Sequence, residues 1–541
     1  MPLYRLNNIK LPVHATVQDA FNEALLLLQL TVDVVSQMRV VKESIDARNK
    51  AHLIKVFAVE FECDKELVES SDLMKLPAAE KLDFQNKGKA LVDLHRPVVV
   101  GSGPAGMMAA LCLAEAGLKP LVLERGASVL ERQKAVDTFW KTGQLSTQTN
   151  VQFGEGGAGT FSDGKLMTGI KKDKFTAKVL HEFATAGAPS EILYLAKPHI
   201  GTDNLVTMVQ NIRRKIIALG GEYRFNEKMD DILLQEMTLD NGEKSSRIKG
   251  IKVLRADGSA YQLDTDILIL ALGHSARDTF QMLYHRGLHI EQKPFAVGVR
   301  IEHKQKDVNL AQYGQKFCNS PYLGAADYKL AEHLDNGRGV YTFCMCPGGN
   351  VVAATSLAGH VVTNGMSEFA RDKENANAAV LVNVDEIDFG SSHPLAGIEF
   401  QEQLEKKAFA LGGYNYFAPV QKVGDFLNGK PTSALGKVLP SYRPGVKPSD
   451  FKQLFPKALY QALQEGIRRM DKKLHGFADD DAVLTAVESR SSSPVRLLRN
   501  DAYMSNIYGV YPIGEGAGYA GGITSAATDG VKLAAALCGL K

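Results

Sequence analysis

The feature that most constrains the fold is a glycine motif between an apolar strand and a helix. The apolar run Val98–Val100 precedes the motif, and the helical segment Met107–Ala116 follows it. Gly101 permits a tight turn, Gly103 lets the backbone approach a pyrophosphate, and Gly106 allows the helix to pack on the strand. The helix N-terminus would present free N–H donors and a positive dipole to phosphates. The predicted phosphate-binding turn comprises Gly101, Ser102, Gly103, Pro104, Ala105 and Gly106.

A second strand and an acidic residue complete this pattern. Pro120–Leu123 is apolar and ends at Glu124, 23 residues beyond Gly101. A carboxylate in that place accepts hydrogen bonds from an adenosine ribose and disfavours a 2′-phosphate. FAD or NAD is therefore preferred to NADP, although the neighbouring Arg125 weakens that exclusion. Both Glu124 and Arg125 are predicted to contact the cofactor.

The C-terminal run from Tyr511 to Ile523 resembles the closing motif of glutathione-reductase-type flavoproteins. The resemblance implies that Glu515 hydrogen-bonds the ribitol of FAD and that the helix start at Gly522 faces the flavin pyrimidine. A helix dipole there would stabilise an anionic reduced flavin. The usual acid is Asp, and Glu is one methylene longer. The cofactor contacts predicted from this motif are Gly514, Glu515, Gly521, Gly522 and Ile523.

A third glycine-rich stretch, residues 154–164, holds five glycines in eleven residues. Such a loop costs conformational entropy, and a close backbone approach to a ligand explains it. The alternative is a flexible surface loop. We expect it to lie along the flavin ring, with Ser162 or Lys165 as neighbours. Its predicted contacts are Gly156, Gly157, Ala158, Gly159 and Thr160.

Two weaker elements lie between the glycine motifs in the order this superfamily uses. Ile269–His274 resembles the strand-end element that contributes Gly273, and residues 220–229 resemble the strand whose end, at Met229, contacts adenine.

Several phrases together resemble one family, the uncharacterised FAD-dependent dehydrogenases, over nearly the whole chain from Ile9 onward. They are NVQFGEGGAGTFSDGKL, PHIGTD, GHSARDTF, KPFAVGVRIEH, YTFCMCPGG, VVTNGMS and SRSSSPVR. The resemblance implies a glutathione-reductase-like FAD domain that a second domain interrupts and a small domain precedes. It implies no substrate.

The predicted fold class is therefore α/β: a split Rossmann-like FAD domain, an inserted mixed α+β domain and a small α+β, ferredoxin-like N-terminal domain. The predicted boundaries are 1–92, 93–290, 291–485 and 486–541, the second and fourth segments forming the FAD domain. Periodicity predicts strands over 3–10, 32–41, 51–61, 249–256 and 261–271, and helices over 17–28, 203–219 and 455–474. Residues 290–450 are predicted to be more irregular, with hairpin-like pieces and Gly/Pro punctuation, and to form the second, mixed domain.

The balance of charged residues and the pattern of cysteines limit which partners and which compartment we expect for this protein. The chain has 63 Lys and Arg against 61 Asp and Glu, and residues 1–95 have 12 against 14. Neither balance favours nucleic acid or an anionic membrane. Six cysteines without a C-x-x-C pair indicate reduced thiols, and with no signal peptide or membrane span we expect a cytoplasmic protein. No metal site is predicted.

The catalytic candidates are His274, Lys165 and Arg300. His274 follows the apolar strand, with Arg277 and Asp278 behind it, at the end of a sheet where ligands bind. It could protonate a substrate, hydrogen-bond the flavin or cap a helix. Convergence of several arginines on the substrate side would indicate an anionic substrate, with structural ion pairs as the alternative. Those side chains are Arg300, His303, Arg490 and Arg496.

Cys344-Met345-Cys346 invites a redox interpretation, but a C-x-C pair forms only a strained disulfide, and buried structural cysteines are common.

The leading hypothesis is an FAD-dependent oxidoreductase that exchanges hydride between flavin N5 and an unidentified small molecule. Only one dinucleotide fingerprint is present, so electrons would come from the substrate or from NAD(P)H entering transiently. The alternatives are a flavin-dependent RNA-modifying enzyme and a non-catalytic FAD-binding protein.

Overall fold

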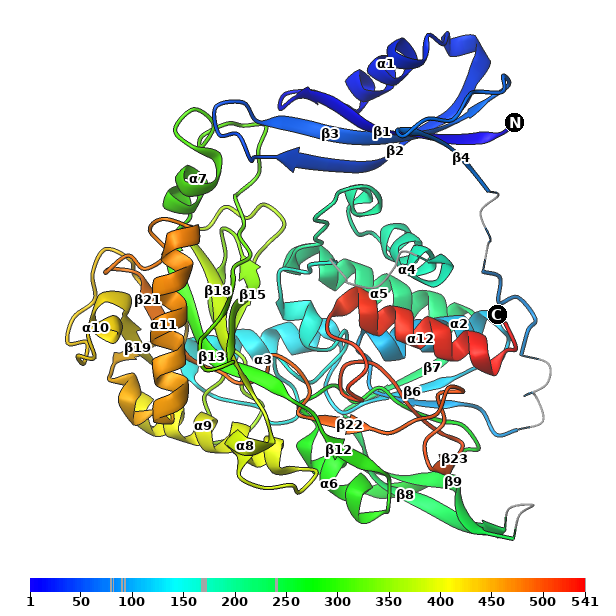
Figure 1. Ribbon diagram of the computed structural model, residues 1–541. Coiled ribbons are helices and arrows are strands. Elements are labelled where there is room, and N and C mark those ends of the chain that lie inside the picture. The colour runs from blue at the N-terminus through cyan, green and yellow to red at the C-terminus, as the bar shows by residue number, and fades with distance from the viewer. Residues whose placement is uncertain are drawn as a thin grey trace.

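Three sheet-based parts make up the computed structural model (Figure 1). The structure describes residues 1–77, 80, 82–88, 91, 94–166, 173–238 and 242–540. Among these residues, none of the helices is long and apolar enough to cross a bilayer.

The N-terminal part is a four-stranded antiparallel sheet with one helix against it. Thr16 caps that helix in a capping box with Asp19, which explains where it begins. The strand order is β2-β3-β1-β4. A ferredoxin-like unit would have a second helix before its last strand, and residues 64–72 form none. The elements are β1 (Leu3–Pro12), α1 (Val17–Leu28), β2 (Val35–Asp46), β3 (Ile54–Cys63) and β4 (Leu73–Leu76).

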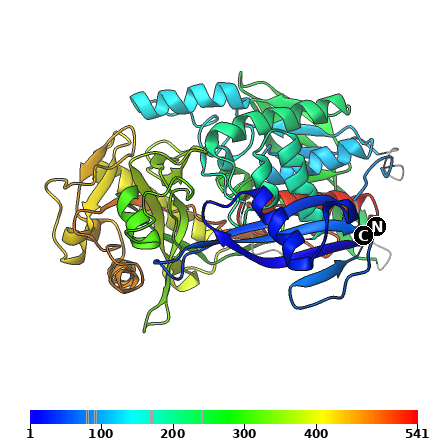
Figure 2. The same ribbon diagram turned by 90° about the horizontal axis from the view of Figure 1, so that it is seen from above.

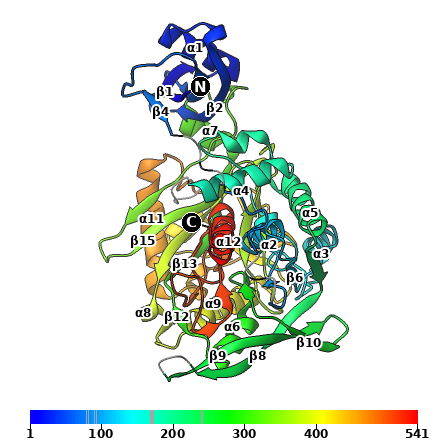
Figure 3. The ribbon, with the colours of Figure 1, turned by 90° about the vertical axis from the view of Figure 1, so that its right-hand side faces the viewer.

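The central part is a split Rossmann-like unit built on a five-stranded parallel sheet in the order β24-β11-β5-β6-β7. Its edge strand β24 comes from near the end of the chain and pairs with β11, so separated stretches of the chain build this unit. One face is covered by helices, among which α12 lies against α2 (Figures 1 and 3). The strands are β5 (Val98–Val100), β6 (Leu121–Glu124), β7 (Glu222–Phe225), β11 (Leu268–Leu270) and β24 (Val510–Pro512); the helices are α2 (Pro104–Glu115), α3 (Val129–Thr142), α4 (Lys174–Thr185), α5 (Thr202–Ala218) and α12 (Ile523–Leu537).

A second, smaller sheet packs on the other face of the parallel sheet. The single strand predicted over 261–271 is wrong: it is two strands, β10 and β11, in different sheets. Tyr261 and Leu263 are half-buried and alternate with exposed residues, whereas residues 268–270 are wholly buried, so the two halves meet different surroundings. The sheet contains β8 (Glu227–Thr238), β9 (Lys244–Arg255), β10 (Ala260–Asp264) and β23 (Ile507–Tyr508).

The third part is built on a seven-stranded mixed sheet, which agrees with the predicted second, mixed domain with hairpin-like pieces but is more regular than the sequence over residues 290–450 suggested. Strand β13 is buried along nine of its ten residues, since the sheet is covered on both faces. Strands of that kind lack the polar alternation by which sequence patterns reveal a sheet. In sheet order the strands are β14 (Ala331–His333), β15 (Gly339–Cys346), β18 (Asn375–Val384), β13 (Phe295–Lys304), β21 (Val483–Glu488), β19 (Ala418–Lys422) and β20 (Val446–Pro448).

Helices and short strands surround this sheet and join it to the parallel one. The long predicted helix is α11 (Lys457–Lys473). The others are α6 (Arg277–His285), α7 (Gln305–Tyr313), α8 (Glu386–Phe389), α9 (Ala396–Gly412), α10 (Val423–Leu427), and the pairs β12 (Ile290–Gln292) with β22 (Val495–Leu497) and β16 (Asn350–Ala353) with β17 (Thr363–Met366).

The N-terminal part spans the other two (Figures 1 and 2). Glu43 forms a β-bridge with Leu195 on the parallel-sheet side, and Lys316 donates to the Ala51 carbonyl from the seven-stranded side. The predicted boundary at 92/93 lies outside the described residues, and the one at 485/486 falls inside β21. The domain limits stay predictions.

Candidate functional site

A single cavity joins the two glycine-rich helix starts that lie some four hundred residues apart in sequence. It opens at the carboxyl ends of the parallel strands, where open α/β sheets bind ligands. Its empty space is about 1620 Å³, including open solvent at the mouth. Of the predicted cofactor contacts, the lining contains Gly101, Ser102, Gly103, Pro104, Ala105, Glu124, Arg125, Gly157, Ala158, Gly159, Met229, Gly273, Gly514, Glu515, Gly521, Gly522 and Ile523.

Three predicted contacts lie behind the lining. A Cβ on Gly106 would stand 2.0 Å from the Gly101 carbonyl, so this glycine packs the helix on the strand. The glycine-rich stretch 154–164 is called the glycine loop from here on. Gly156 and Thr160 contact each other on the side of this loop that faces away from the cavity, toward Val209 of α5.

The first glycine turn is built for an anion. Gly101 has φ = +104°, and a Cβ there would lie 2.2 Å from the Ala271 carbonyl, so no larger residue fits. No side chain caps the N-terminus of α2 at Gly103, which leaves its N–H groups directed at the cavity.

Glu124 stabilises this turn through hydrogen bonds that the sequence did not predict. Its carboxylate accepts backbone N–H bonds from Ser102 at 2.9 Å, Gly126 at 2.9 Å and Gly154 at 3.0 Å. The residue predicted to hold a ribose therefore also ties the first glycine turn to the glycine loop. Arg125 pairs with Asp278 at 2.8 Å beside it.

The glycine loop is held from behind by Arg132, a residue that sequence reasoning missed. This wholly buried side chain donates five hydrogen bonds, of 2.7–3.2 Å, to main-chain carbonyls of the glycine loop and of the residues just before it. Burial lowers its pKa to about 10, so it stays charged at neutral pH. The loop is consequently a fixed wall of the cavity. The acceptors are the carbonyls of Asn150, Val151, Gly154, Glu155 and Gly157.

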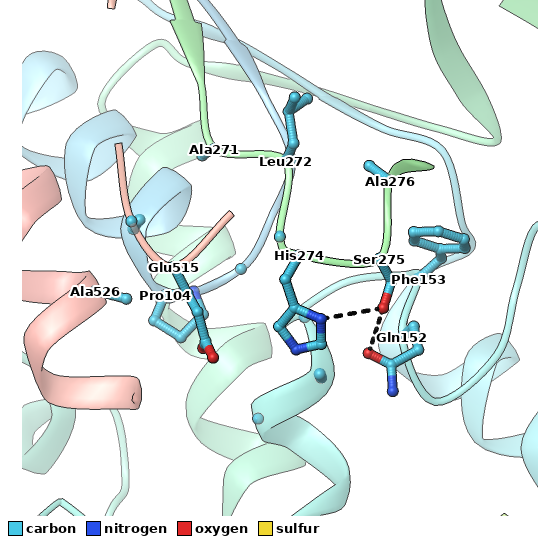
Figure 4. Close-up of a pocket in the computed structure, with 18 of the residues that line it drawn as sticks. Pro104, Gln152, Phe153, Ala271, Leu272, His274, Ser275, Ala276, Glu515 and Ala526 are labelled. Atoms are coloured by element: carbon cyan, nitrogen blue, oxygen red, sulfur yellow. Dashed lines mark hydrogen bonds between the residues drawn. The ribbon is translucent and has the colours of Figure 1, made fainter. Parts of the chain in front are cut away.

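The closing motif approaches the first one closely. A Cβ on Gly530 would lie 2.2 Å from the Ala105 carbonyl, which explains why α12 can lie against α2. The Glu515 carboxylate extends into the cavity (Figure 4), and no other described residue hydrogen-bonds it. Desolvation raises its pKa to about 7. α12 begins at Gly522 without a side-chain cap.

These features fit a dinucleotide. The cavity presents two uncapped helix N-termini, a carboxylate without a partner, and glycines at 521 and 522 where a Cβ would meet nothing within 4 Å. In the described part of the chain, no group of three or more His, Cys, Asp and Glu side chains is placed to hold a metal ion.

Two of the three catalytic candidates line the cavity. His274 does so with a half-buried ring, and its pKa is lowered to about 3 by burial and by the charges of Arg490 and Arg277. It is a neutral imidazole, so a role as proton donor at neutral pH is not supported. Lys165 pairs with Asp163 at 3.0 Å and also donates to the Met345 carbonyl.

Arg300 does not reach the cavity, which corrects its placement among the catalytic candidates. It is fully buried and pairs with Glu488 at 3.0 and 3.1 Å. Its other N–H groups donate to the Cys344 carbonyl at 2.9 Å, Asn377 at 2.8 Å and Asn364 at 3.1 Å. With all five donors used, Arg300 positions the cavity wall and contacts no ligand.

Of the other substrate-side candidates, only Arg490 lines the cavity. His303 hydrogen-bonds the Phe477 carbonyl, and Arg496 lies over the Tyr519 ring. Arg490 and Arg277 both form two bonds of 2.8–3.0 Å with the buried carboxylate of Glu405.

Cys344 and Cys346 are free thiols, and both line the cavity. Cys344 is exposed to the cavity, with φ = +41°, and desolvation by the surrounding cavity walls raises its thiol pKa to about 12. A raised pKa disfavours the thiolate that redox chemistry needs.

The comparisons with known proteins agree with this geometry. Residues 96–142 match the family described as "FAD binding domain", and residues 294–491 match "FAD-dependent protein, C-terminal domain-like". An uncharacterized protein of Clostridium beijerinckii is 46% identical over 536 residues, which are 98% of this chain and 97% of that protein.

Solved structures are more distant. The glycerol-3-phosphate dehydrogenase of Bacillus halodurans complexed with FAD is 10% identical, with 84% of this chain and 68% of that chain covered and a TM-score of 0.35. A flavoprotein/dehydrogenase of Cytophaga hutchinsonii is 11% identical, with 83% and 80% covered and a TM-score of 0.33. Likenesses of this size carry no argument about the reaction.

Proposed function

The chain belongs to a family of FAD-dependent flavoproteins, and from that premise we propose that it is an oxidoreductase that exchanges hydride between FAD and a small anionic molecule. The observation that carries the proposal is the cavity that connects both glycine-rich helix starts and continues past His274 to a wall from the seven-stranded sheet. When bound, FAD supplies the two-electron chemistry.

The chain's own residues would hold the cofactor in the manner of glutathione-reductase-type flavoproteins. The α2 N-terminus at Gly103 would bind the pyrophosphate, and Glu515 would meet the ribityl hydroxyls. The start of α12 at Gly522 would lie toward the flavin, where its dipole favours negative charge.

The wall formed by the seven-stranded sheet, strand β17 and the segment after β21, here called the substrate wall, includes Cys344, Asn364, Glu488 and Arg490. The ion pairs on and behind it, together with those of Asp163 in the glycine loop, contain five cations and four carboxylates, a surplus of one positive charge. Enclosed charge of one sign favours a ligand of the other sign. The cations are Lys165, Arg277, Arg300, Arg371 and Arg490, and the carboxylates are Asp163, Glu402, Glu405 and Glu488.

Lys165 and Arg490 are the two of these cations that line the cavity. Lys165 uses two of its three N–H donors on protein acceptors, and Arg490 uses four of its five. Each keeps one donor for a ligand. Electrons reach the flavin from the substrate itself or from NAD(P)H that enters transiently.

A matched pair of glycine variants tests the cofactor site. Gly103→Ala places a methyl group 3.8 Å from the nearest protein atom, so the fold is retained and only the cradle is filled. Gly106→Ala collides with the Gly101 carbonyl and is expected to lower the melting temperature without FAD. We expect the wild type to take up FAD and turn yellow, and Gly103→Ala to bind it at least ~10-fold more weakly, about 1.4 kcal/mol. A colourless wild type that refuses FAD would refute the proposal.

Sulfite tests the charge of the substrate side, because this anion binds reversibly to oxidised flavins and bleaches their absorbance. Lys165→Met removes a cation from the cavity lining and is expected to weaken sulfite binding roughly tenfold, about 1.4 kcal/mol. The control is Lys228→Met, which removes a cation from the adenine end of the same cavity. Equal sulfite affinities in the two variants would contradict an anion site at Lys165.

A further inference from the structure

His274 presents one ring nitrogen to the protein and the other to the cavity (Figure 4). Its Nδ1 lies 3.4 Å from the hydroxyl oxygen of Ser275. Among the described residues, Nε2 has no protein partner. Which nitrogen carries the proton decides what the imidazole offers a ligand.

The hydroxyl proton of Ser275 is already committed. Its Oγ lies 3.0 Å from Gln152 Oε1 and 3.0 Å from Arg490 Nη1. Gln152 donates its amide N–H to the Ala354 carbonyl at 3.0 Å, which fixes the amide with its oxygen toward Ser275. A flipped amide would place two carbonyl oxygens against each other. Because an amide oxygen only accepts and an arginine only donates, Ser275 gives its proton to Gln152.

Ser275 can then offer Nδ1 of His274 only a lone pair. A bare Nδ1 would set two lone pairs against each other, so Nδ1 carries the hydrogen. The neighbouring charged groups, Arg490, Arg277 and Glu405, sum to one positive charge, and with burial they keep the imidazole neutral. In a neutral ring with a hydrogen on Nδ1, Nε2 is an acceptor.

We propose that His274 is a specificity-determining hydrogen-bond acceptor, and that the ligand atom opposite its Nε2 is an O–H or N–H donor. A carbonyl or carboxylate oxygen there would meet a lone pair. The donor belongs either to the cofactor or to the substrate. In the second case, which rests on the proposed function, the substrate combines an anionic group for Lys165 with a hydroxyl or amine for His274.

The tautomer can be measured by long-range ¹H–¹⁵N correlation spectra of the full chain labelled with ¹⁵N-histidine, the His274 signal being assigned by its loss in His274→Gln. Two other histidines serve as internal standards. His303 donates from Nε2 to the Phe477 carbonyl at 2.8 Å, and His360 donates from Nδ1 to the Ala358 carbonyl at 2.8 Å. At pH 7 the His274 pattern is expected to match that of His360. A match to His303, or a doubly protonated ring, overturns the proposal.

A pair of Gln152 variants tests whether the hydrogen bond from Ser275 to Gln152 sets the tautomer of His274. Gln152→Leu removes the acceptor, so the Ser275 proton can turn to Nδ1, and most of the His274 signal is expected to change to the His303 pattern. Gln152→Glu keeps an acceptor and is expected to keep the His360 pattern. Unchanged signals of His303 and His360 show that each variant is folded. A Gln152→Leu spectrum identical to the wild type overturns the network.

Adding FAD separates the two sources of the donor. A shift of the Nε2 resonance on binding of oxidised or dithionite-reduced FAD assigns the donor to the cofactor. An Nε2 resonance that both forms leave unchanged assigns it to the substrate. Because the tautomer is measured without FAD, its failure is distinct from a failure of the proposed function, which would appear as no FAD uptake.

Discussion

The Glu515 carboxyl group lies in a desolvated part of the cavity, where its negative charge costs free energy. Desolvation in the cavity raises its pKa to about 7, from an ordinary value of about 4.3. The folded chain therefore holds a proton that the unfolded chain releases between these two values. The cost of the buried charge appears as pH rises through this window and is complete above pH 7.

Without FAD, Glu515→Gln should remove this pH dependence. A carboxamide does not ionise, so the loss of stability between pH 5 and pH 8 is expected to be smaller in the variant by about 1–2 kcal/mol, since one pKa unit is ~1.4 kcal/mol and the partly open cavity screens the charge. Melting curves at both pH values measure it. Glu515→Asp keeps a carboxylate and serves as the control; equal pH dependence in the wild type and Glu515→Gln would contradict the assignment.

Among individual residues, the chemical role of a residue was easier to predict than the place of its side chain in the structure. Glu124, Glu515 and the glycines were identifiable because a turn that approaches phosphate permits few residue types. Arg300 and Arg490 are alike in sequence, yet only Arg490 lines the cavity. Arg300 lies inside strand β13 and is fully buried, whereas Arg490 lies in the segment after β21, and the packing around each segment decides whether its guanidinium group reaches the cavity.

Helix α3 and the glycine loop act as one element through Arg132. Five carbonyl acceptors on a buried guanidinium fix a loop whose glycines would otherwise leave it flexible. The sequence predicted the loop but not its anchor, because an arginine in an amphipathic helix has no local sign that it turns inward.

Arg132→Lys keeps the charge but cannot reach five carbonyls with three donors. It is expected to leave buried carbonyls unsatisfied, at about 1–3 kcal/mol, and to loosen the loop. We expect faster proteolytic cleavage within residues 150–160 and weaker FAD binding than in the wild type. Lys134→Ala, at an exposed position of the same helix, should change neither. Cleavage at the wild-type rate would show that Arg132 does not hold the loop.

At the scale of the whole molecule, Glu405 of α9 ties together chain segments from both sides of the cavity. It binds Arg277 at the start of α6 and Arg490 beyond β21, with no exposed surface of its own. The two guanidinium groups hold its pKa well below the usual range. It contributes stability above its ordinary pKa and loses it only as pH falls.

Glu405→Gln would leave two buried arginines sharing no carboxylate. Breaking a buried ion pair in this way costs about 3–5 kcal/mol, so we expect a clearly lower melting temperature at pH 7 and weaker FAD binding. Glu402→Gln is the control, because Glu402 lies 3.6 Å from Arg277 with 28% of its side chain exposed and should cost under about 1 kcal/mol. Similar melting temperatures for the two variants would refute the role of the network.

The sequence by itself determined the dinucleotide site, the order of its parts and the return of the chain to close it. These features can be recognised in the local sequence, because positive φ or close backbone contact requires glycine. The helical spacing of apolar residues and an acidic residue directly after a strand can be recognised in the same way. The tertiary structure alone decided that seven strands between Phe295 and Glu488 form one sheet, that Arg132 and Arg300 turn away from the cavity, and that the proton of Ser275 points to Gln152. Each of these depends on which distant residues become neighbours, and burial on all sides erases the polar alternation from which neighbours could be inferred.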